Sequence, residues 1–252
     1  MNYALQLYTM RQPAAQDVVG TLQRVREIGW THVQWSGMPT MTAQQIRDAL
    51  QQADLKPVIC HCAVQEFETD FETAVAYWKT AGFYDVAAGM MMTECRDSLE
   101  GWLDGARRLD AIGANLRAVG MRLSYHNHSF EFETFEGDSR CKLDMLYEET
   151  GPQNLYAELD TAWLEHGGVD PAAYIRKMAN RCPVIHLKDI NRGYTKDQFS
   201  FVPLGQGALN WPEIFQAARD AGVEWAVYEQ DTTTDPFEDC RVSLEFLKAH
   251  LS

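Results

Sequence analysis

Four pairs of polar side chains, each pair two positions apart, lie in the second half of the chain. The pairs are His126 and His128, Glu158 and Asp160, His186 and Lys188, and Glu229 and Asp231. Each pair ends or follows a run that reads as a strand, and side chains two positions apart on a strand share a face. Imidazole nitrogen and carboxylate oxygen are ligands for Mn2+, Co2+, Zn2+ and Mg2+. The pairs therefore predict one shared polar pocket able to hold a divalent cation.

Short strand-like runs alternate with longer helical periodicities along the whole chain, which is typical of βα units and a parallel sheet. We expect eight strands, near residues 4–8, 32–35, 57–61, 85–88, 122–126, 156–160, 184–188 and 225–229. Among the helices between and after them we expect 17–28, 42–53, 97 or 98 to 119, 212–222 and 236–250. This pattern predicts an α/β fold.

The chain has 252 residues, close to the roughly 250 of a (β/α)8 TIM barrel. An open doubly wound sheet would also use such units, but it carries a glycine-rich turn after its first strand, where this chain has Leu7-Tyr8-Thr9-Met10-Arg11. We therefore predict one (β/α)8 barrel domain over 1–252. Charged groups inside a barrel are costly to bury, so the polar pairs belong at the carboxyl-terminal mouth, where barrel active sites lie.

Each polar residue also has a structural explanation when taken alone. His186 fits a core histidine bonded to a backbone carbonyl, and Asp160 and Glu229 fit helix caps or loop carboxylates. Lys188 fits a salt bridge to Glu158 or Asp189. Their convergence from four strands favours a functional site.

Composition limits the class of partner. The formal net charge of -14 repels phosphodiester backbones and anionic lipid, so we expect neither nucleic acid nor a membrane as partner. The chain start lacks the pattern of a secretory leader, so we expect a cytoplasmic protein. Six cysteines without scaffold spacing predict reduced thiols. Cys60-His61-Cys62 suggests a zinc site, but a strand would separate His61 from the two thiols.

Gly205-Gln206-Gly207 follows the seventh predicted strand, where barrels often hold phosphate, although a tight turn explains it equally well. Lys188 and Arg192 are the few basic residues nearby, so we favour a non-phosphorylated sugar or polyol. Trp163 is the best candidate to stack on a sugar face, while packing of the rim is the alternative.

At these residues the sequence resembles the xylose isomerase-like barrels, the sugar phosphate isomerase/epimerase family that includes inosose dehydratase. The resemblance runs over nearly the whole chain, through Leu5-Gln6-Leu7-Tyr8-Thr9-Met10-Arg11, Tyr125-His126-Asn127-His128-Ser129-Phe130-Glu131-Phe132, Glu158-Leu159-Asp160, His186-Leu187-Lys188-Asp189, Gly205-Gln206-Gly207 and Tyr228-Glu229-Gln230-Asp231. It implies a (β/α)8 barrel and allows a homo-oligomer.

The resemblance also implies a divalent metal, Mn2+ first, with Co2+, Mg2+ or Zn2+ as alternatives. Its ligands would be Asp160, His186, Glu229 and the residue at the end of the fifth strand. Many relatives have a glutamate there, whereas this chain has His126. Either His126 is the ligand or Glu131 reaches back from the following loop. We expect the substrate to be bound by Gln6, Tyr8, Glu131, Trp163 and Lys188.

A metal that chelates a carbonyl and a neighbouring hydroxyl would acidify the intervening C–H and stabilise an enediolate. Glu229 is the expected base, with His128, Glu158 or His61 returning the proton and Lys188 stabilising the oxyanion. We therefore expect a metal-dependent isomerase or epimerase of a keto or aldo sugar. The alternative is a lyase or dehydratase acting on an inosose or a 3-keto-glycoside. A DNA-repair endonuclease, which shares this barrel, is opposed by the acidic charge, and a sugar-binding barrel without chemistry is a fourth reading.

Overall fold

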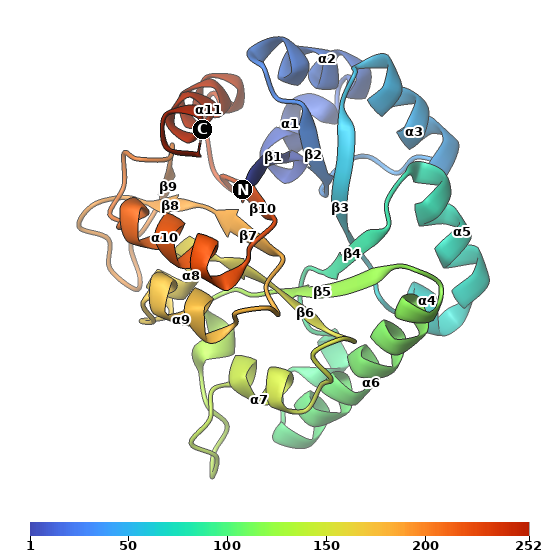
Figure 1. Cartoon of the computed structure of the whole chain (residues 1–252), viewed down its shortest axis with the longest axis vertical. Coiled ribbons are helices and arrows are strands. Elements are labelled where there is room, and N and C mark those ends of the chain that lie inside the picture. Colours follow the sequence, from blue (N-terminus) through green and yellow to red (C-terminus); the bar gives the residue numbers. More distant parts are fainter. Residues whose placement is uncertain (252) are drawn as a thin grey trace.

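The protein, described over residues 1–251 in a computed structural model, is a closed barrel of eight parallel strands surrounded by helices (Figure 1). Around the barrel the order is β1, β10, β7, β6, β5, β4, β3 and β2. The strands span β1 Asn2–Gln6, β2 His32–Trp35, β3 Lys56–Cys62, β4 Asp85–Ala88, β5 Arg122–His126, β6 Tyr156–Asp160, β7 Val184–Leu187 and β10 Trp225–Tyr228. The predicted (β/α)8 barrel is confirmed.

The strand positions agree with those predicted except at the beginning of the chain. Residues 4–8 were expected to form the first strand, but β1 ends at Gln6 and a 3-10 turn, Leu7–Met10, follows. The side chain of Gln6 accepts a hydrogen bond from the backbone N–H of Tyr8, which turns the chain out of the strand. Tyr8 therefore lies on the mouth of the barrel and not within its wall.

The helices begin and end where capping residues predict. They span α1 Arg11–Ala14, α2 Val18–Ile28, α3 Ala43–Gln52, α4 Glu66–Thr69, α5 Phe71–Ala81, α6 Leu99–Ala118, α7 Lys142–Glu148, α8 Thr161–His166, α9 Pro171–Lys177, α10 Trp211–Ala221 and α11 Pro236–Leu251. Thr42 and Gln45 form a capping box at α3, and Ser98 caps α6. Within residues 1–251, no helix combines the length and apolar character needed to span a bilayer.

Side chains along each strand alternate between the core outside the barrel wall and the interior of the barrel. Outward-facing side chains such as Leu123 and Cys60 pack beneath the helices, while His61, next to Cys60, faces the interior. A small apolar layer of Ala4, Ile59, Ala87, Val184 and Val227 fills the middle of the barrel. This layer separates the polar mouth from the amino-terminal end.

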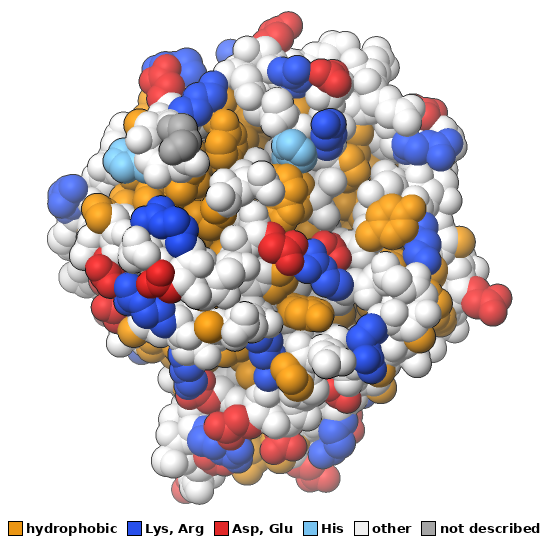
Figure 2. Space-filling view, in the orientation of Figure 1, with side chains coloured by type: hydrophobic (Ala, Val, Ile, Leu, Met, Phe, Trp, Pro, Cys, Tyr) orange, Lys and Arg blue, Asp and Glu red, His pale blue; other side chains and the backbone are white. Residues whose placement is uncertain are grey.

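Ion pairs close the amino-terminal end of the barrel. Arg122, at the start of β5, lies 2.7 Å from Asp85 at the start of β4 and 2.8 Å from Glu224, which precedes β10. The face seen in Figure 2 carries acidic and basic side chains interspersed, with apolar patches between them. Opposite charges thus hold together strands that are distant in sequence at the end away from the candidate site.

Helix α6 packs so closely against the segment before β6 that there is no room for a side chain at Gly113. A Cβ atom at this position would lie 1.9 Å from the backbone oxygen of Asn154. Alanine is intrinsically about 1 kcal/mol better than glycine inside a helix, but backbone atoms cannot yield to it cheaply. We expect Gly113→Ala to lower the free energy of unfolding by about 1–3 kcal/mol because of overpacking.

Urea denaturation measures this effect, and Asn115→Ala is the matched control. Asn115 is exposed on the same helix, so its replacement should leave stability unchanged or raise it slightly. Equal stability of Gly113→Ala and the wild type would contradict the close approach.

Candidate active site

Side chains from four neighbouring strands meet at the mouth of the barrel. His126 ends β5, Asp160 ends β6, His186 lies in β7 and Glu229 follows β10. Parallel pairing sets Asp160 beside His186 and Val227 beside His186, which brings the ends of these strands together. All four residues are buried, and one ligand atom from each lies within 4.8 Å of the others. The structure thus brings together the four residues that were expected to hold a metal.

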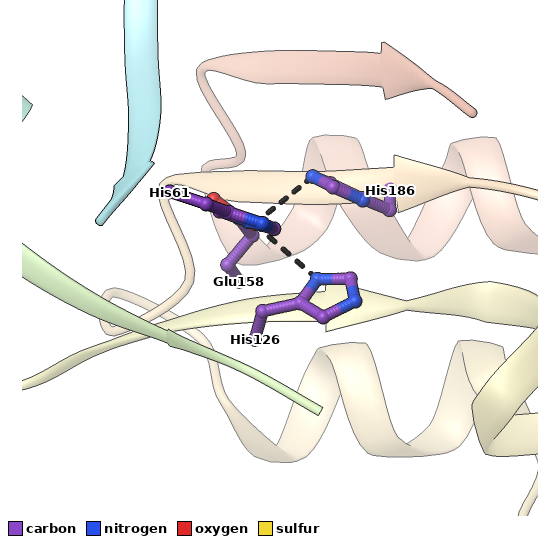
Figure 3. A group of neighbouring side chains, drawn as sticks. All are labelled: His61, His126, Glu158 and His186. Atoms are coloured by element: carbon purple, nitrogen blue, oxygen red, sulfur yellow. Dashed lines mark hydrogen bonds and ion pairs between the residues drawn. The ribbon is translucent and has the colours of Figure 1, made fainter. Parts of the chain in front are cut away.

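A second group of side chains surrounds the carboxylate of Glu158, on β6. Figure 3 shows His61, His126 and His186 gathered around it. Glu158 Oε1 lies 2.5 Å from His61 Nε2, 3.3 Å from His126 Nδ1 and 2.9 Å from His186 Nε2. The three histidines and Glu158 also meet the distance criterion for a cation site. Because the carboxylate oxygen already lies beside all three imidazole nitrogens, a cation there would have to displace these interactions.

Lys188 supplies a positive charge to the carboxylates on the other side of the site. Its Nζ lies 3.0 Å from Asp160 Oδ2, 2.9 Å from Glu229 Oε2 and 2.9 Å from Asp231 Oδ1. The structural explanation that paired Lys188 with Glu158 or Asp189 is therefore wrong, because its ion-pair partners are these three carboxylates. Burial lowers the pKa of Lys188, but these three carboxylates outweigh it and raise the pKa well above its ordinary value.

The pKa values of three histidines at the mouth differ because of their neighbours. Burial lowers the pKa of His186, but Glu158 and Glu229 outweigh it and raise the pKa to about 10. Burial, reinforced by His186, lowers the pKa of His126 well below its usual value. Burial and the charge of Lys188 lower the pKa of His128 to about 3. The pKa of His186 is thus shifted in the opposite direction from the pKa values of His126 and His128.

Asp160 is the buried carboxylate between Lys188 and His126. Its Oδ2 atom lies 3.0 Å from Lys188 Nζ and 4.0 Å from His126 Nε2. Burial raises the pKa of Asp160 to about 6, and Lys188 offsets this only in part. Together with His126, His186 and Glu229 it offers two imidazole nitrogens and two carboxylate oxygens, a donor set that suits a divalent ion.

The site opens into a pocket of about 210 Å³. The sequence-predicted residues that line it are Tyr8, His61, His126, His128, Lys188 and Glu229. Asp231 also lines it, together with Ser36, Gly89 and Met90, which the sequence analysis did not single out. The ring of Trp163 lies beside the rim, 5.4 Å from that of His128.

Two of the predicted substrate-binding residues lie behind the pocket wall. Gln6 is fully buried, and its Nε2 atom has no hydrogen-bond partner. Glu131 is also fully buried; its carboxylate accepts hydrogen bonds from the hydroxyl of Tyr125 and the backbone N–H of His128. In the described residues Glu131 is part of neither cation group. Glu131 holds the His128 backbone, while His126 belongs to both groups.

Sequence analysis missed Gln34, which links the two histidine-rich groups. Gln34 Nε2 donates a hydrogen bond to Glu158, and Gln34 Oε1 lies 2.9 Å from His186 Nε2. It is fully buried in β2, where it occupies an interior position. The signal was present, because a polar residue between Val33 and Trp35 should face the polar interior.

The glycine-containing loop after β7 already encloses an anionic group of the protein itself. The carboxylate of Asp189 accepts hydrogen bonds from the backbone N–H groups of Gly205 and Gly207 and from Trp211 Nε1. A Cβ atom at Gly207 would lie 2.1 Å from Asp189 Oδ1. The N–H groups of Gly205 and Gly207 are thus already bonded to an internal carboxylate.

The comparisons with known proteins agree with this geometry. Residues 22–250 match the family model described as xylose isomerase-like TIM barrel. A sugar phosphate isomerase/epimerase from Parabacteroides distasonis has a TM-score of 0.84, with 18% identity over 99% of this chain and 94% of that one. An L-ribulose 3-epimerase has a TM-score of 0.74, with 16% identity over 99% of this chain and 94% of that one. At these identities the structural similarity establishes the fold alone.

An inosose dehydratase from Clostridium tetani is 35% identical over 147 residues, which cover 52% of this chain and 48% of that protein. The chain therefore matches about half the length of this relative. The family match, in contrast, extends over residues 22–250, which include seven of the eight barrel strands. The chain belongs to the xylose isomerase-like TIM barrel family.

Proposed function

We propose that the protein is a divalent-metal-dependent isomerase or epimerase of a non-phosphorylated keto or aldo sugar. The observation that carries this proposal is the close approach of His126, Asp160, His186 and Glu229, within 4.8 Å of one another, at the base of a polar pocket. A cation held there would polarise a sugar carbonyl and its neighbouring hydroxyl, so that the C–H between them becomes acidic. An enediolate of the sugar is the intermediate that this chemistry predicts.

Glu229 is the base in this proposal. It lines the pocket, and burial raises its pKa, but Lys188 and His186 outweigh burial and hold the pKa well below its usual value. The carboxylate is therefore ionised at neutral pH. His186 Nδ1 and Lys188 Nζ both contact Glu229 Oε2, so these two groups hold the carboxylate at the wall of the pocket.

His61 and His128 are the candidates to return the proton, because both line the pocket. Glu158 was expected to act directly, but it is fully buried and contacts His61 Nε2 at 2.5 Å. In this position Glu158 orients His61 rather than touching substrate. Lys188 lines the pocket beside Glu229 and would stabilise negative charge on a sugar oxygen.

The preference for a non-phosphorylated substrate rests on Asp189. Its carboxylate uses the N–H groups of Gly205 and Gly207 that could otherwise bind phosphate. Tyr8 and Trp163, at the wall and the rim of the pocket, offer rings for the apolar face of a sugar. Gln6 lies beneath Tyr8 and holds its backbone.

A dehydratase is the second candidate, since the chain resembles an inosose dehydratase and carries His126 where many isomerases in this family carry glutamate. Elimination needs one base and one acid but no second carboxylate. An inosose or a 3-keto-glycoside would then yield an enone that absorbs in the ultraviolet. Appearance of this absorption without deuterium exchange into recovered substrate would favour the dehydratase.

Metal binding should stabilise the folded protein. A ligand at 100 times its Kd stabilises a protein by about 2.7 kcal/mol, which corresponds to roughly 5–10 °C in Tm for a chain of this size. We expect Mn2+ to raise the Tm of the wild type by this amount and EDTA to reverse the effect. Asp160→Asn should remove most of the shift, because it replaces a ligand oxygen and its charge.

Differential scanning calorimetry with Mn2+, Co2+, Mg2+ and Zn2+ measures these shifts. Asp197→Asn, a change at an exposed loop position, is the control and should keep the full shift. No shift with any of the four metals, or an equal shift in Asp160→Asn, would contradict the proposed ligand set.

Proton abstraction should be visible as isotope exchange. In deuterated water with Mn2+, we expect the wild type to incorporate deuterium at the carbon next to the carbonyl of its sugar. Because a general base contributes about 10²–10⁴-fold, Glu229→Gln should slow exchange at least 100-fold. NMR follows the loss of the proton signal over a panel of keto sugars. If no sugar exchanges, or if Glu229→Gln exchanges at the wild-type rate, the isomerase or epimerase mechanism is wrong.

A further inference from the structure

A larger and mostly polar pocket adjoins the catalytic pocket at the mouth of the barrel. It has a volume of about 400 Å³, compared with about 210 Å³ for the pocket over the candidate metal ligands. Ser36, His61, Gly89 and Met90 line both of them, so the two pockets are continuous. We call the larger one the outer pocket.

The catalytic pocket alone is small for a ligand site. Sites for small molecules have volumes of roughly 300–1,000 Å³; the catalytic pocket falls below this range, and the outer pocket lies within it. Two residues on their boundary, Ser36 and Gly89, are small. A Cβ atom at Gly89 would lie 3.2 Å from His61 Nδ1, so a side chain there would press on His61 and narrow the passage. A ligand can therefore extend from the catalytic pocket past His61 into the outer pocket.

Polar side chains from the loops after β2, β3 and β4 line the outer pocket without using their hydrogen-bonding groups on the protein. Within residues 1–251, the side chains of Ser36, Gln65 and Thr93 bond to no other residue. Arg96 is anchored by its Nε, which donates a hydrogen bond to the backbone oxygen of Met91 at 2.6 Å, and its Nη groups are left to bind a ligand. The pocket therefore offers hydroxyl, amide and guanidinium groups from three sides.

The lining disfavours both an apolar and an anionic occupant. Met91 and Met92 are buried, which leaves Met90 as the exposed methionine of the wall. An apolar ligand would deprive the polar side chains of water without replacing their hydrogen bonds. Among the described residues of the lining, Arg96 is the only lysine or arginine, and the net charge of -14 repels an anion. A neutral group rich in hydroxyls suits this lining.

We propose that the substrate is a keto sugar linked to a second, uncharged sugar residue, and that the outer pocket binds this second residue. The proposal rests on the proposed function, because it assumes that the keto sugar lies over the candidate metal ligands. The hydroxyl groups of the second residue pair with Gln65, Thr93 and Arg96. A free monosaccharide would leave these three side chains to water.

The test compares ligands with and without the second sugar residue. Methyl β-glucoside and the methyl β-glycosides of cellobiose, maltose and lactose have no free carbonyl group, so they bind without turnover. Isothermal titration calorimetry of the Mn2+-loaded protein gives their affinities. A few added hydrogen bonds predict that at least one of the disaccharides binds about tenfold more tightly than methyl β-glucoside.

Two further ligands represent the other occupants. Phenyl β-glucoside places an aromatic ring beside the sugar, and the methyl glycoside of cellobiouronic acid carries a carboxylate on its second residue. We expect both to bind more weakly than the best neutral disaccharide.

A double variant removes polar groups of the outer pocket that the fold does not use. The Gln65 side chain caps no helix, and Thr93 is exposed, so Gln65→Ala combined with Thr93→Val should leave the protein folded. It should lose most of the preference for the disaccharide and keep the wild-type affinity for methyl β-glucoside, which also shows that the site is intact. Gln52→Ala, at an exposed position of α3 outside the pocket lining, is the control and should keep the full preference.

Equal affinities of the wild type for methyl β-glucoside and all three disaccharides, including no detectable binding of any of them, would overturn the proposal. So would tighter binding of the phenyl glucoside or the uronic acid, or an unchanged preference in the double variant. Deuterium exchange into keto monosaccharides and keto-sugar disaccharides tests the proposed chemistry separately. Exchange without a preference for the second residue would refute this inference alone, while a preference without exchange would refute the proposed chemistry alone.

Discussion

The compensation of buried negative charge organises the mouth of this barrel. Glu158, Asp160 and Glu229 are almost completely removed from solvent, where an isolated carboxylate would be very costly. Glu158 is balanced by imidazoles from β3, β5 and β7, and Glu229 is balanced by His186 and Lys188. The compensating groups come from β3, β5 and the carboxyl-terminal end of β7, so the electrostatic network and the closure of the barrel depend on each other.

His186 is the link between the two halves of this network. Its Nε2 contacts Glu158 and its Nδ1 contacts Glu229, so one ring joins the carboxylate behind the pocket to the carboxylate that lines it. A change of charge on His186 is therefore felt on both sides of the site. His61, which contacts the same oxygen of Glu158, lies nearly parallel to His186, with ring centroids 5.6 Å apart.

Much of this architecture could be predicted from sequence because alternation along strands is a local rule. The strand runs at His32–Trp35 and Arg122–His126 were predicted with the observed bounds, and the polar pairs at strand ends were expected to share a pocket. The partners of Lys188 could not be predicted, since they depend on how the tilt of the strands brings β6, β7 and the segment after β10 together. Tyr8 was predicted to lie within a strand, but β1 ends at Gln6, whose side chain accepts a hydrogen bond from the backbone N–H of Tyr8.

The loop whose N–H groups bind Asp189 limits how substrate preference can change in this protein. Because the N–H groups of this loop already bind the Asp189 carboxylate, few are left to bind an external anion. The negative charge of Asp189 would also repel such an anion. Acquisition of a phosphorylated substrate would thus require more than additional basic residues at the rim. The acid would first have to be lost, while Gly207 would still exclude a side chain, because a Cβ atom there would also lie 2.3 Å from the backbone oxygen of Ile190.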